Sequence, residues 1–501
     1  METELKLKVG ASDIALLREH PLLAELSNAA PREHELTDTY YDTPDLDLWR
    51  AGLTLRVRQD GDTWIQTVKT AANGSSALHQ RGEWESSLDG PQPAPDTVAR
   101  QIKSQRVNSI LRAPDVIDAL QPVFTNTTRR TTWDLELPDG LLVECAIDKG
   151  SIEGKDRKVD FAELELELKQ GDPARLFELA LNLHQDVPLQ LSNDSKAARG
   201  YALLRNETPQ PVKAVPVELK RKMRMEDALQ VISLNCMAQI EANLPGVLVQ
   251  SVESLHQMRV GLRRLRALLD MFGELAPLPD ELHEGLEWLS GELGTTRDWD
   301  VLAETTLAGV EGINVEALQA AALEKARALH RDMLPTLQSP RFTRLVLQLN
   351  AWLHGRGWRP AEGLEKGDPL RERAREGMAP LLHKAQQRLR KRIDALDEQD
   401  APQRHRVRIA AKKARYAAEF FADLLPGRAV KLYTKQLSAL QDRLGHLNDL
   451  AVADKLLPVL ENHGHSHDAA YARGYAAGVA DAESRGLRQA LDRIARLRLQ
   501  R

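Results

Sequence analysis

The sequence predicts an α+β protein of more than one domain, with an antiparallel β-rich region up to about residue 205 and an all-α region after about residue 218. In the first region, strand-like segments carry a charged side chain at every second position. In the second region, Leu, Ala, Arg and Glu recur with the helical period of about 3.6 residues. This change of period, in a chain of 501 residues, indicates separate domains with separate cores.

The alternation begins at the N-terminus, where Glu2, Glu4 and Lys6 alternate with Leu5 and Leu7. Successive side chains of a strand project to opposite faces, so such a strand has one charged and one apolar face. The same spacing recurs in Arg56 and Arg58, in Glu83 and Glu85, and in Glu163, Glu165 and Glu167. A barrel with a charged lumen and an apolar exterior would produce this pattern. An open sheet with one solvated, salt-bridged face would produce it as well, and the alternation alone does not separate the two.

The mixed signs of the charged face indicate what a barrel lumen could bind. Carboxylates on some walls would hold a hard divalent cation. Arginine and lysine on other walls would hold a polyanion such as phosphate. Any such binding must come from local charge, because the net charge of the chain is −5.

The composition also bounds the partners and the compartment. The net charge of −5 gives no overall attraction to nucleic acid or to an anionic membrane, so neither is expected as a partner. No apolar run reaches the length of about 18 residues that a membrane span needs. Cys145 and Cys236 have no metal-type spacing and indicate a reducing compartment without disulfides. Without a signal-peptide pattern, the cytoplasm is the expected location.

Prolines mark the predicted domain boundary. Residues 206–217 contain Pro209, Pro211 and Pro216 and are typical of an extended linker. The first domain is therefore expected at 1–205 and the helical domain at 218–501. The helical domain is expected to form long antiparallel helices in bundles, as two repeats at about 218–355 and 370–501.

The repeat rests on a duplicated stripe of basic residues. The first copy is His256, Arg259, Arg263 and Arg266, and the second copy is His405, Arg408, Lys412 and Arg415. At helical spacing, each copy falls within about 80° of arc, which is one stripe along a helix. Both copies are followed by a Leu-Gly segment that leads to an aspartate, Asp298 in the first and Asp449 in the second.

A basic stripe is usually a solvated face whose cations pair with acids on the same helix. Here no Asp or Glu occurs between Ser254 and Leu269 or between Ala401 and Ala418, so partners at i±4 are missing within those segments. Unpaired cations in a row repel one another unless an anion bridges them, and a linear polyphosphate is a suitable anion. The histidines, with an ordinary pKa of about 6.5, would add charge as the pH falls.

The first region resembles the CYTH superfamily, the triphosphate tunnel metalloenzymes. The resemblance begins with Glu2-x-Glu4-x-Lys6, and further segments match in order: 40–44, 52–58, 67–69, 78–83, Arg130 with Trp133, 144–148, 163–167 and 195–201. The duplicated His-x-x-Arg helices and their Leu-Gly…Asp segments resemble the CHAD domain. Together the two regions look like the bacterial CYTH–CHAD inorganic triphosphatases, which implies an antiparallel barrel of about eight strands enclosing a triphosphate tunnel.

The resemblance implies roles for individual residues. Glu2 and Glu4, with some of Glu163, Glu165 and Glu167, would bind Mg²⁺ or Mn²⁺, and at least one of the last three is expected only to balance basic residues of the lumen. The basic residues implied to contact the substrate are Lys6, Arg56, Arg58, Lys69, Arg81, Arg130 and Lys196. The implied reaction is hydrolysis of inorganic tripolyphosphate to pyrophosphate and phosphate, and the implied partner of the two helical stripes is long-chain polyphosphate.

Two other functions stay open at this point. The barrel could hydrolyse or cyclise an organic triphosphate such as thiamine triphosphate or a nucleotide. Recognition of an organic group needs aromatic or amide side chains, and the aromatic content of only 4% favours the inorganic substrate. Alternatively, the protein could be a non-catalytic polyphosphate-binding or granule-targeting protein with an inactive barrel.

Overall fold

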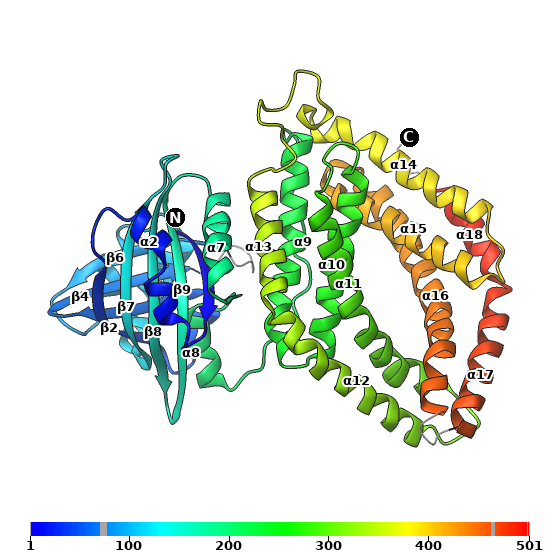
Figure 1. The fold of residues 1–501 in the computed structure, drawn as a ribbon, viewed down its shortest axis with the longest axis horizontal. Coiled ribbons are helices and arrows are strands. Elements are labelled where there is room, and N and C mark those ends of the chain that lie inside the picture. Colours follow the sequence, from blue (N-terminus) through cyan, green and yellow to red (C-terminus); the bar gives the residue numbers. More distant parts are fainter. Residues whose placement is uncertain (1, 71–77, 462–465, 498, 500–501) are drawn as a thin grey trace. The chain divides into compact units, whose positions relative to one another are not determined.

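The computed structural model describes residues 2–70, 78–461, 466–497 and 499. The chain forms two compact units (Figure 1). The first unit contains residues 1–210 together with 338–355, and the second contains residues 211–337 and 356–501. None of the helices within the described ranges is long and apolar enough to cross a membrane.

The first unit is built on one antiparallel sheet. In the described residues its strands are β1 (Glu2–Val9), β2 (Arg32–Asp42), β3 (Leu53–Asp60), β4 (Thr63–Thr70), β5 (Leu78–Arg81), β6 (Glu83–Leu88), β7 (Gln121–Glu136), β8 (Leu142–Gly154), β9 (Arg157–Gln170) and β10 (Leu189–Leu191). Their order is β10-β1-β9-β8-β7-β2-β3-β4-β6, and β5 pairs with β1.

The sheet closes through Gly82. This residue alone separates β5, which pairs with β1, from β6, which pairs with β4, so the two ends of the strand order meet. A Cβ at position 82 would lie 2.4 Å from the ring of Trp84, so only glycine fits at this bend. Counted as one bent strand, β5 and β6 complete a barrel of the size the sequence predicts, and the predicted fold class is confirmed.

The alternation of the sequence corresponds to the two faces of the barrel wall. On β1 and β9, the outward residues Leu5, Leu7, Leu164 and Leu166 are each 0% exposed. Short helices cover the barrel, namely α1 (Ile14–Arg18), α2 (Pro21–Leu26), α3 (Asp47–Arg50), α4 (Pro95–Ala99), α5 (Gln105–Leu111) and α6 (Pro114–Asp118). Helix α7 (Ala174–Asp186) contacts β9 and also packs against α13 (Pro340–His354), which comes from much later in the sequence.

Helix α8 (Lys196–Arg205) lies against β7 and β8. Its first turn is capped by Ser195, whose hydroxyl accepts a hydrogen bond from the backbone N–H of Ala198 at 3.1 Å. On the same helix, the ring of Tyr201 meets Phe124 edge to face, and Phe124 stacks on Tyr40. A Cβ at Gly200 would lie 2.2 Å from the Phe124 ring, so this close approach requires glycine. These contacts fix the helix and bring its first residues to the lumen.

The second unit is helical. Its long helices are α9 (Met225–Leu248), α10 (Val252–Phe272), α11 (Asp280–Val301), α12 (Glu316–Leu337), α14 (Ala374–Asp394), α15 (Ala401–Phe420), α16 (Gly427–Leu460), α17 (Ser466–Ser484) and α18 (Leu487–Ala495). Short turns also occur at η1 (Leu302–Thr306), η2 (Leu307–Gly309), η3 (Pro369–Arg371) and η4 (Ala422–Leu424). Residues 207–220 contain no helix or strand.

Corresponding helices of the two predicted repeats lie beside each other in this unit. Helices α9 and α14 begin beside each other, since Arg224 and Arg373 form an isolated antiparallel bridge immediately before them. The two stripe-bearing helices, α10 and α15, contact each other. The stripes of the two repeats therefore come from neighbouring helices of one unit.

Candidate active site and cationic surface

The lumen of the barrel contains a cavity of about 270 Å³. All seven basic residues that the sequence predicts for catalysis lie on its wall: Lys6, Arg56, Arg58, Lys69, Arg81, Arg130 and Lys196. Of the predicted metal ligands, Glu2, Glu4, Glu165 and Glu167 also line it, and Glu163 is fully buried beside Lys196 and Arg199. The cavity wall thus carries both signs of charge.

The register of β1 and β9 explains part of this arrangement. Glu4 pairs with Glu167, and Lys6 pairs with Glu165, in directly opposed positions of the two strands. The ammonium of Lys6 contacts Glu165 and lies 3.2 Å from Glu4. Burial by itself would lower the pKa of Lys6, but the charges of Glu165 and Glu4 outweigh it and hold the pKa above its ordinary value.

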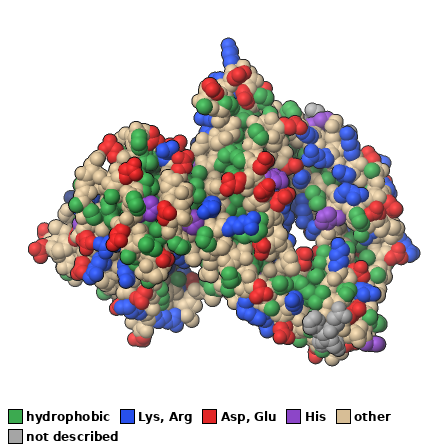
Figure 2. Space-filling model, in the orientation of Figure 1, with side chains coloured by type: hydrophobic (Ala, Val, Ile, Leu, Met, Phe, Trp, Pro, Cys, Tyr) green, Lys and Arg blue, Asp and Glu red, His purple; other side chains and the backbone are tan. Residues whose placement is uncertain are grey.

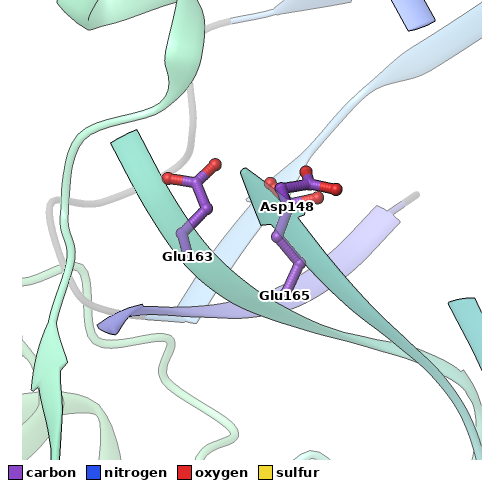
Figure 3. Close-up of side chains that lie close together, drawn as sticks. All are labelled: Asp148, Glu163 and Glu165. Carbon is purple, nitrogen blue, oxygen red and sulfur yellow. The ribbon is translucent and has the colours of Figure 1, made fainter. Parts of the chain in front are cut away.

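Three carboxylates gather on β8 and β9 (Figure 3). One oxygen each of Asp148, Glu163 and Glu165 lies within 4.8 Å of the others. The ammonium of Lys196 lies 2.7 Å from Asp148 and 2.9 Å from Glu165, and it also contacts Glu163. Protein cations therefore neutralise this cluster, and Lys196, Lys6 and Arg130 hold the pKa of Glu165 well below its ordinary value against the opposing effect of burial.

A fully buried aspartate organises the arginines of β3. Both oxygens of Asp38 accept hydrogen bonds from Arg58, at 2.7 and 2.9 Å. Asp38 also accepts a hydrogen bond from Asn126 and lies 3.7 Å from Arg56. Burial opposes its ionisation, yet the charges of Arg56 and Arg58 lower its pKa far below the ordinary value. These contacts hold two substrate-binding candidates in fixed positions.

Asp38 and Asp148 are functional candidates that the sequence predictions missed. Asp38 stands two residues before Tyr40 on β2, and Asp148 stands four residues after Glu144 on β8. Tyr40 and Glu144 both line the cavity. Strand parity alone could have placed both on the charged face. The sequence does not show which arginine or lysine each would meet, because that depends on strand register.

The other carboxylates of the cavity are Glu2, Glu4, Glu83, Glu85, Glu144 and Glu167. Glu2 accepts from Lys69 at 3.0 Å and from Arg81 at 2.9 Å, Glu4 is paired with Lys6 and Arg81, and Glu167 lies 2.8 Å from Lys169. Burial raises the pKa of Glu167, and the charges of Glu2 and Glu144 add to the rise. A wall with several such hard oxygen donors fits a divalent cation.

On the helical unit, the predicted stripes divide into two kinds of cation. Arg266 lies 3.6 Å from Glu287, and Arg415 lies 3.5 Å from Glu419, which stands just beyond the acid-free segment of the sequence. The other four, Arg259, Arg263, Arg408 and Lys412, have no salt bridge within the described residues, and we call them the central cations. They occupy equivalent positions in the two repeats.

The central cations are close enough to repel one another. Burial, together with the charges of Arg408 and Arg263, lowers the pKa of Lys412 to about 7. Burial and Arg263 likewise lower the pKa of Arg259 to about 10. Nε of Arg259, Arg263 and Arg408 is buried without a hydrogen-bond partner. Such groups are suited to an anion that is not part of the chain.

The two histidines of the stripes behave differently from the central cations. His405 lies within hydrogen-bond distance of Asn448, at 2.8 Å. Burial lowers the pKa of His256, and Arg297 lowers it further. Elsewhere on the surface, acidic and basic side chains are interspersed over the face shown in Figure 2. The concentration of unpaired positive charge on α10 and α15 is therefore a local feature.

Comparison with known proteins identifies both units. Residues 1–201 match the family model of the CYTH domain, and residues 232–458 match that of the CHAD domain. An inorganic triphosphatase from Haemophilus influenzae is 30% identical over 203 residues, which cover 40% of this chain and 55% of that protein. This chain thus spans about half the length of that relative. The crystal structure of the CHAD domain from the plant Ricinus communis is 34% identical, with a TM-score of 0.53, and the match covers 58% of this chain and 99% of that domain.

Proposed function

We propose that this chain, in which a CYTH domain precedes a CHAD domain, hydrolyses inorganic tripolyphosphate to pyrophosphate and phosphate in the lumen of its barrel. The observation that carries the proposal is the cavity of about 270 Å³ whose wall holds the seven predicted basic residues beside four of the predicted glutamates. The name of the Haemophilus influenzae relative supports a triphosphate substrate.

The basic residues supply most of what phosphoryl transfer needs from a protein. Tripolyphosphate carries several negative charges, and catalysis consists mainly of positioning and of neutralising the charge that develops. Arg56, Arg58 and Arg130 offer forked donors to phosphate oxygens, whereas Lys69 and Lys196 act as point charges. Because Asp38 and Asp148 hold these side chains in place before substrate binds, little reorganisation remains at the moment of reaction.

Glu2, Glu4 and Glu167 are the residues that would hold Mg²⁺ or Mn²⁺. Their carboxylate oxygens are the ligands such cations prefer, and all three line the cavity, whereas Glu163 does not. A bound cation supplies charge neutralisation and a more acidic water at the terminal phosphate. Glu163, paired with Lys196 and Arg199, is the glutamate that balances lumen cations.

An inorganic substrate fits the cavity better than an organic one. Of the described residues that line the cavity, Tyr40 alone is aromatic. Its ring is already stacked on that of Phe124, with the ring centroids 4.4 Å apart. The other rings nearby, Tyr201 and Trp49, stack on each other at 4.3 Å. The wall therefore offers no free platform for a base or a thiazole ring.

Phosphate release from tripolyphosphate, ATP and thiamine triphosphate tests the proposal, each with magnesium, with manganese and without metal. The expected result is release from tripolyphosphate that depends on metal and exceeds release from the two organic substrates. Faster release from ATP or thiamine triphosphate would show that the substrate is an organic triphosphate. Turnover of none of them would leave polyphosphate binding as the function.

We further propose that the helical unit binds long-chain polyphosphate through the central cations. They form no salt bridge among the described residues and they lower one another's pKa values, which supports this, although Asp298 and Asp449 lie near enough to act in the opposite direction. Binding should weaken steeply with salt, because neutralising a polyanion releases counterions. A gel-shift titration of the full chain without metal tests it. Equal affinity after Arg259, Arg263, Arg408 and Lys412 are all changed to Ala would contradict it.

A further inference from the structure

The second unit contains a larger cavity, of about 720 Å³. It lies among α10, α15 and the segment that joins α10 to α11. Its size falls in the range of about 300–1,000 Å³ that small-molecule sites occupy. It includes two of the central cations from α15 and one from α10.

The lining of this cavity is mixed in chemistry. Its cationic part includes Arg263, Arg266, Arg408 and Lys412. Of the described lining residues, Asp270 alone is acidic, and Lys413 and Arg388 already bind it, at 2.9 and 3.0 Å. Arg266 is paired with Glu287, so Arg263, Arg408 and Lys412 are the cations of this group that can meet an anion from outside the chain.

Another part of the lining is apolar. Ile409 is 41% exposed, Pro277 is exposed and Leu278 is half-buried, while Leu286 and Tyr416 are buried. Polyphosphate has no apolar atoms to place against such a wall. Apolar side chains held open beside unpaired cations are instead complementary to a ligand that carries both an oligophosphate and an apolar group.

We propose that this cavity binds a nucleoside oligophosphate, with the phosphates on Arg263, Arg408 and Lys412 and the base and ribose against Ile409 and Leu278. The inference rests on the proposed role of the central cations in binding phosphate, and it adds a ligand class that the stripes alone do not specify.

The charge and size of the site favour a nucleotide over a phospholipid. Four basic residues suit three or more phosphates, whereas a lipid phosphate presents one. The exposed apolar wall consists of short patches from α15 and from one loop. It matches a compact ring system better than a long acyl chain.

Calorimetric titration of the full chain in EDTA tests the proposal, with ATP, tripolyphosphate and decyl phosphate as the probes. Without metal the barrel is not expected to hydrolyse the probes. Any binding of a probe in the barrel contributes equally to the measured affinity of every variant, because the substitutions lie in the helical unit. Ile409→Ser and Leu278→Ser should weaken ATP binding by about five- to tenfold, as loss of apolar contact on the order of 50 Å² implies. Tripolyphosphate binding should not change. Leu432→Ser, an exposed leucine on α16 outside the cavity, is the matched control.

The outcomes separate this inference from the proposal on which it rests. Equal effects of Ile409→Ser on ATP and on tripolyphosphate, or no effect on either, would overturn the nucleotide site while leaving phosphate binding intact. Tighter binding of decyl phosphate than of ATP would also overturn it in favour of a lipid. Lys412→Ala should weaken ATP and tripolyphosphate alike, and failure of both to bind the parent protein would overturn both proposals.

Discussion

The barrel lumen and the cationic surface of the helical unit both collect basic side chains, but they surround them differently. In the lumen, Arg58 has Asp38 and Lys196 has Asp148 within hydrogen-bond distance. On the helical unit, Arg408 and Lys412 have no such acid among the described residues. In the lumen, Lys196 and Arg130 have raised pKa values, whereas Arg408 and Lys412 of the helical unit have lowered pKa values.

This difference suggests different uses of charge. Paired lumen cations are held in place and are suited to orienting one small substrate for reaction. Unpaired cations on neighbouring helices gain most from whichever polyanion covers them, and they need no fixed geometry. We expect substitutions in the two regions to affect stability in opposite directions.

Glu4→Gln should have the largest effect. It removes one carboxylate charge at nearly constant volume from a residue that is 3% exposed. We expect triphosphatase turnover to fall by at least about 100-fold, together with affinity for Mn²⁺ measured by calorimetry. Glu35→Gln is the control, because that glutamate is 81% exposed and pairs with the surface residue Arg129. Wild-type turnover of Glu4→Gln in magnesium would show that the metal assignment is wrong.

Arg58→Ala should lower both activity and stability. The sequence suggests an effect mainly on catalysis, since no apolar core is lost. The structure adds that the change leaves Asp38 buried without its bidentate partner, at a cost of about 2–4 kcal/mol in the free energy of unfolding. We expect kcat/KM to fall by about 10- to 100-fold.

A second substitution separates the two effects of Arg58→Ala. Adding Asp38→Asn removes the stranded charge and should restore much of the melting temperature but none of the activity. Recovery of activity in the double variant would mean that Arg58 does not contact the substrate.

Arg263→Ala with Lys412→Ala should have a smaller effect, with the opposite sign for stability. Removing two cations that repel each other should leave the melting temperature unchanged or raise it. Polyphosphate affinity should fall by about tenfold at low salt and less at high salt. Arg266→Ala is the comparison, because Arg266 has Glu287 and Ser290 as partners. A lowered melting temperature of the double variant would contradict the repulsion.

The smallest expected effect is a dependence of polyphosphate affinity on pH. Lys412, with a pKa lowered to about 7, is charged in the free protein below that pH, so affinity is greatest there. Above that pH, Lys412 of the free protein is neutral and must take up a proton when a polyanion binds, so affinity should fall by up to about tenfold per pH unit. The sequence attributes such a dependence to the histidines, but the lowered pKa of His256 moves its protonation below its ordinary range. Lys412→Arg stays charged at these pH values, so its polyphosphate affinity should depend less on pH. An unchanged dependence in this variant would show that another group causes it.

Much of the barrel could be predicted because the alternation of charged and apolar residues along a strand shows which face each side chain occupies. Glu2, Glu4 and Lys6 reach the lumen for the same reason that Leu5 and Leu7 reach the core. The pairing of lumen charges could not be predicted, since it depends on which strands are neighbours. Helical periodicity likewise placed Arg259 and Arg408 on matching stripes, but it did not predict the contact between the helices α10 and α15 that carry them.

The local sequence also does not show that equivalent positions of the two repeats have different structural roles. Arg264 and Lys413 follow Arg263 and Lys412 at the same offset in the two repeats. In the structure, Arg264 is buried, donates to Gln239 and lies over the ring of Phe420, whereas Lys413 binds Asp270. The neighbours that decide between these roles come from other helices.

Helix α13 has a consequence for dissecting the molecule. It belongs to the unit of the barrel, where His354 stacks on Phe177 and the carbonyl of Pro340 lies 2.9 Å from His184. The backbone therefore passes between the units after residues 210, 337 and 355. One proteolytic nick between the units would cut the chain into two polypeptides, but each unit would still be linked to the other by an uncut crossing, so size-exclusion chromatography would report a single particle while a denaturing gel shows two fragments. A fragment that ends near residue 205 would expose Phe177 to water, so an independently soluble barrel needs residues 338–355 grafted back through a short linker.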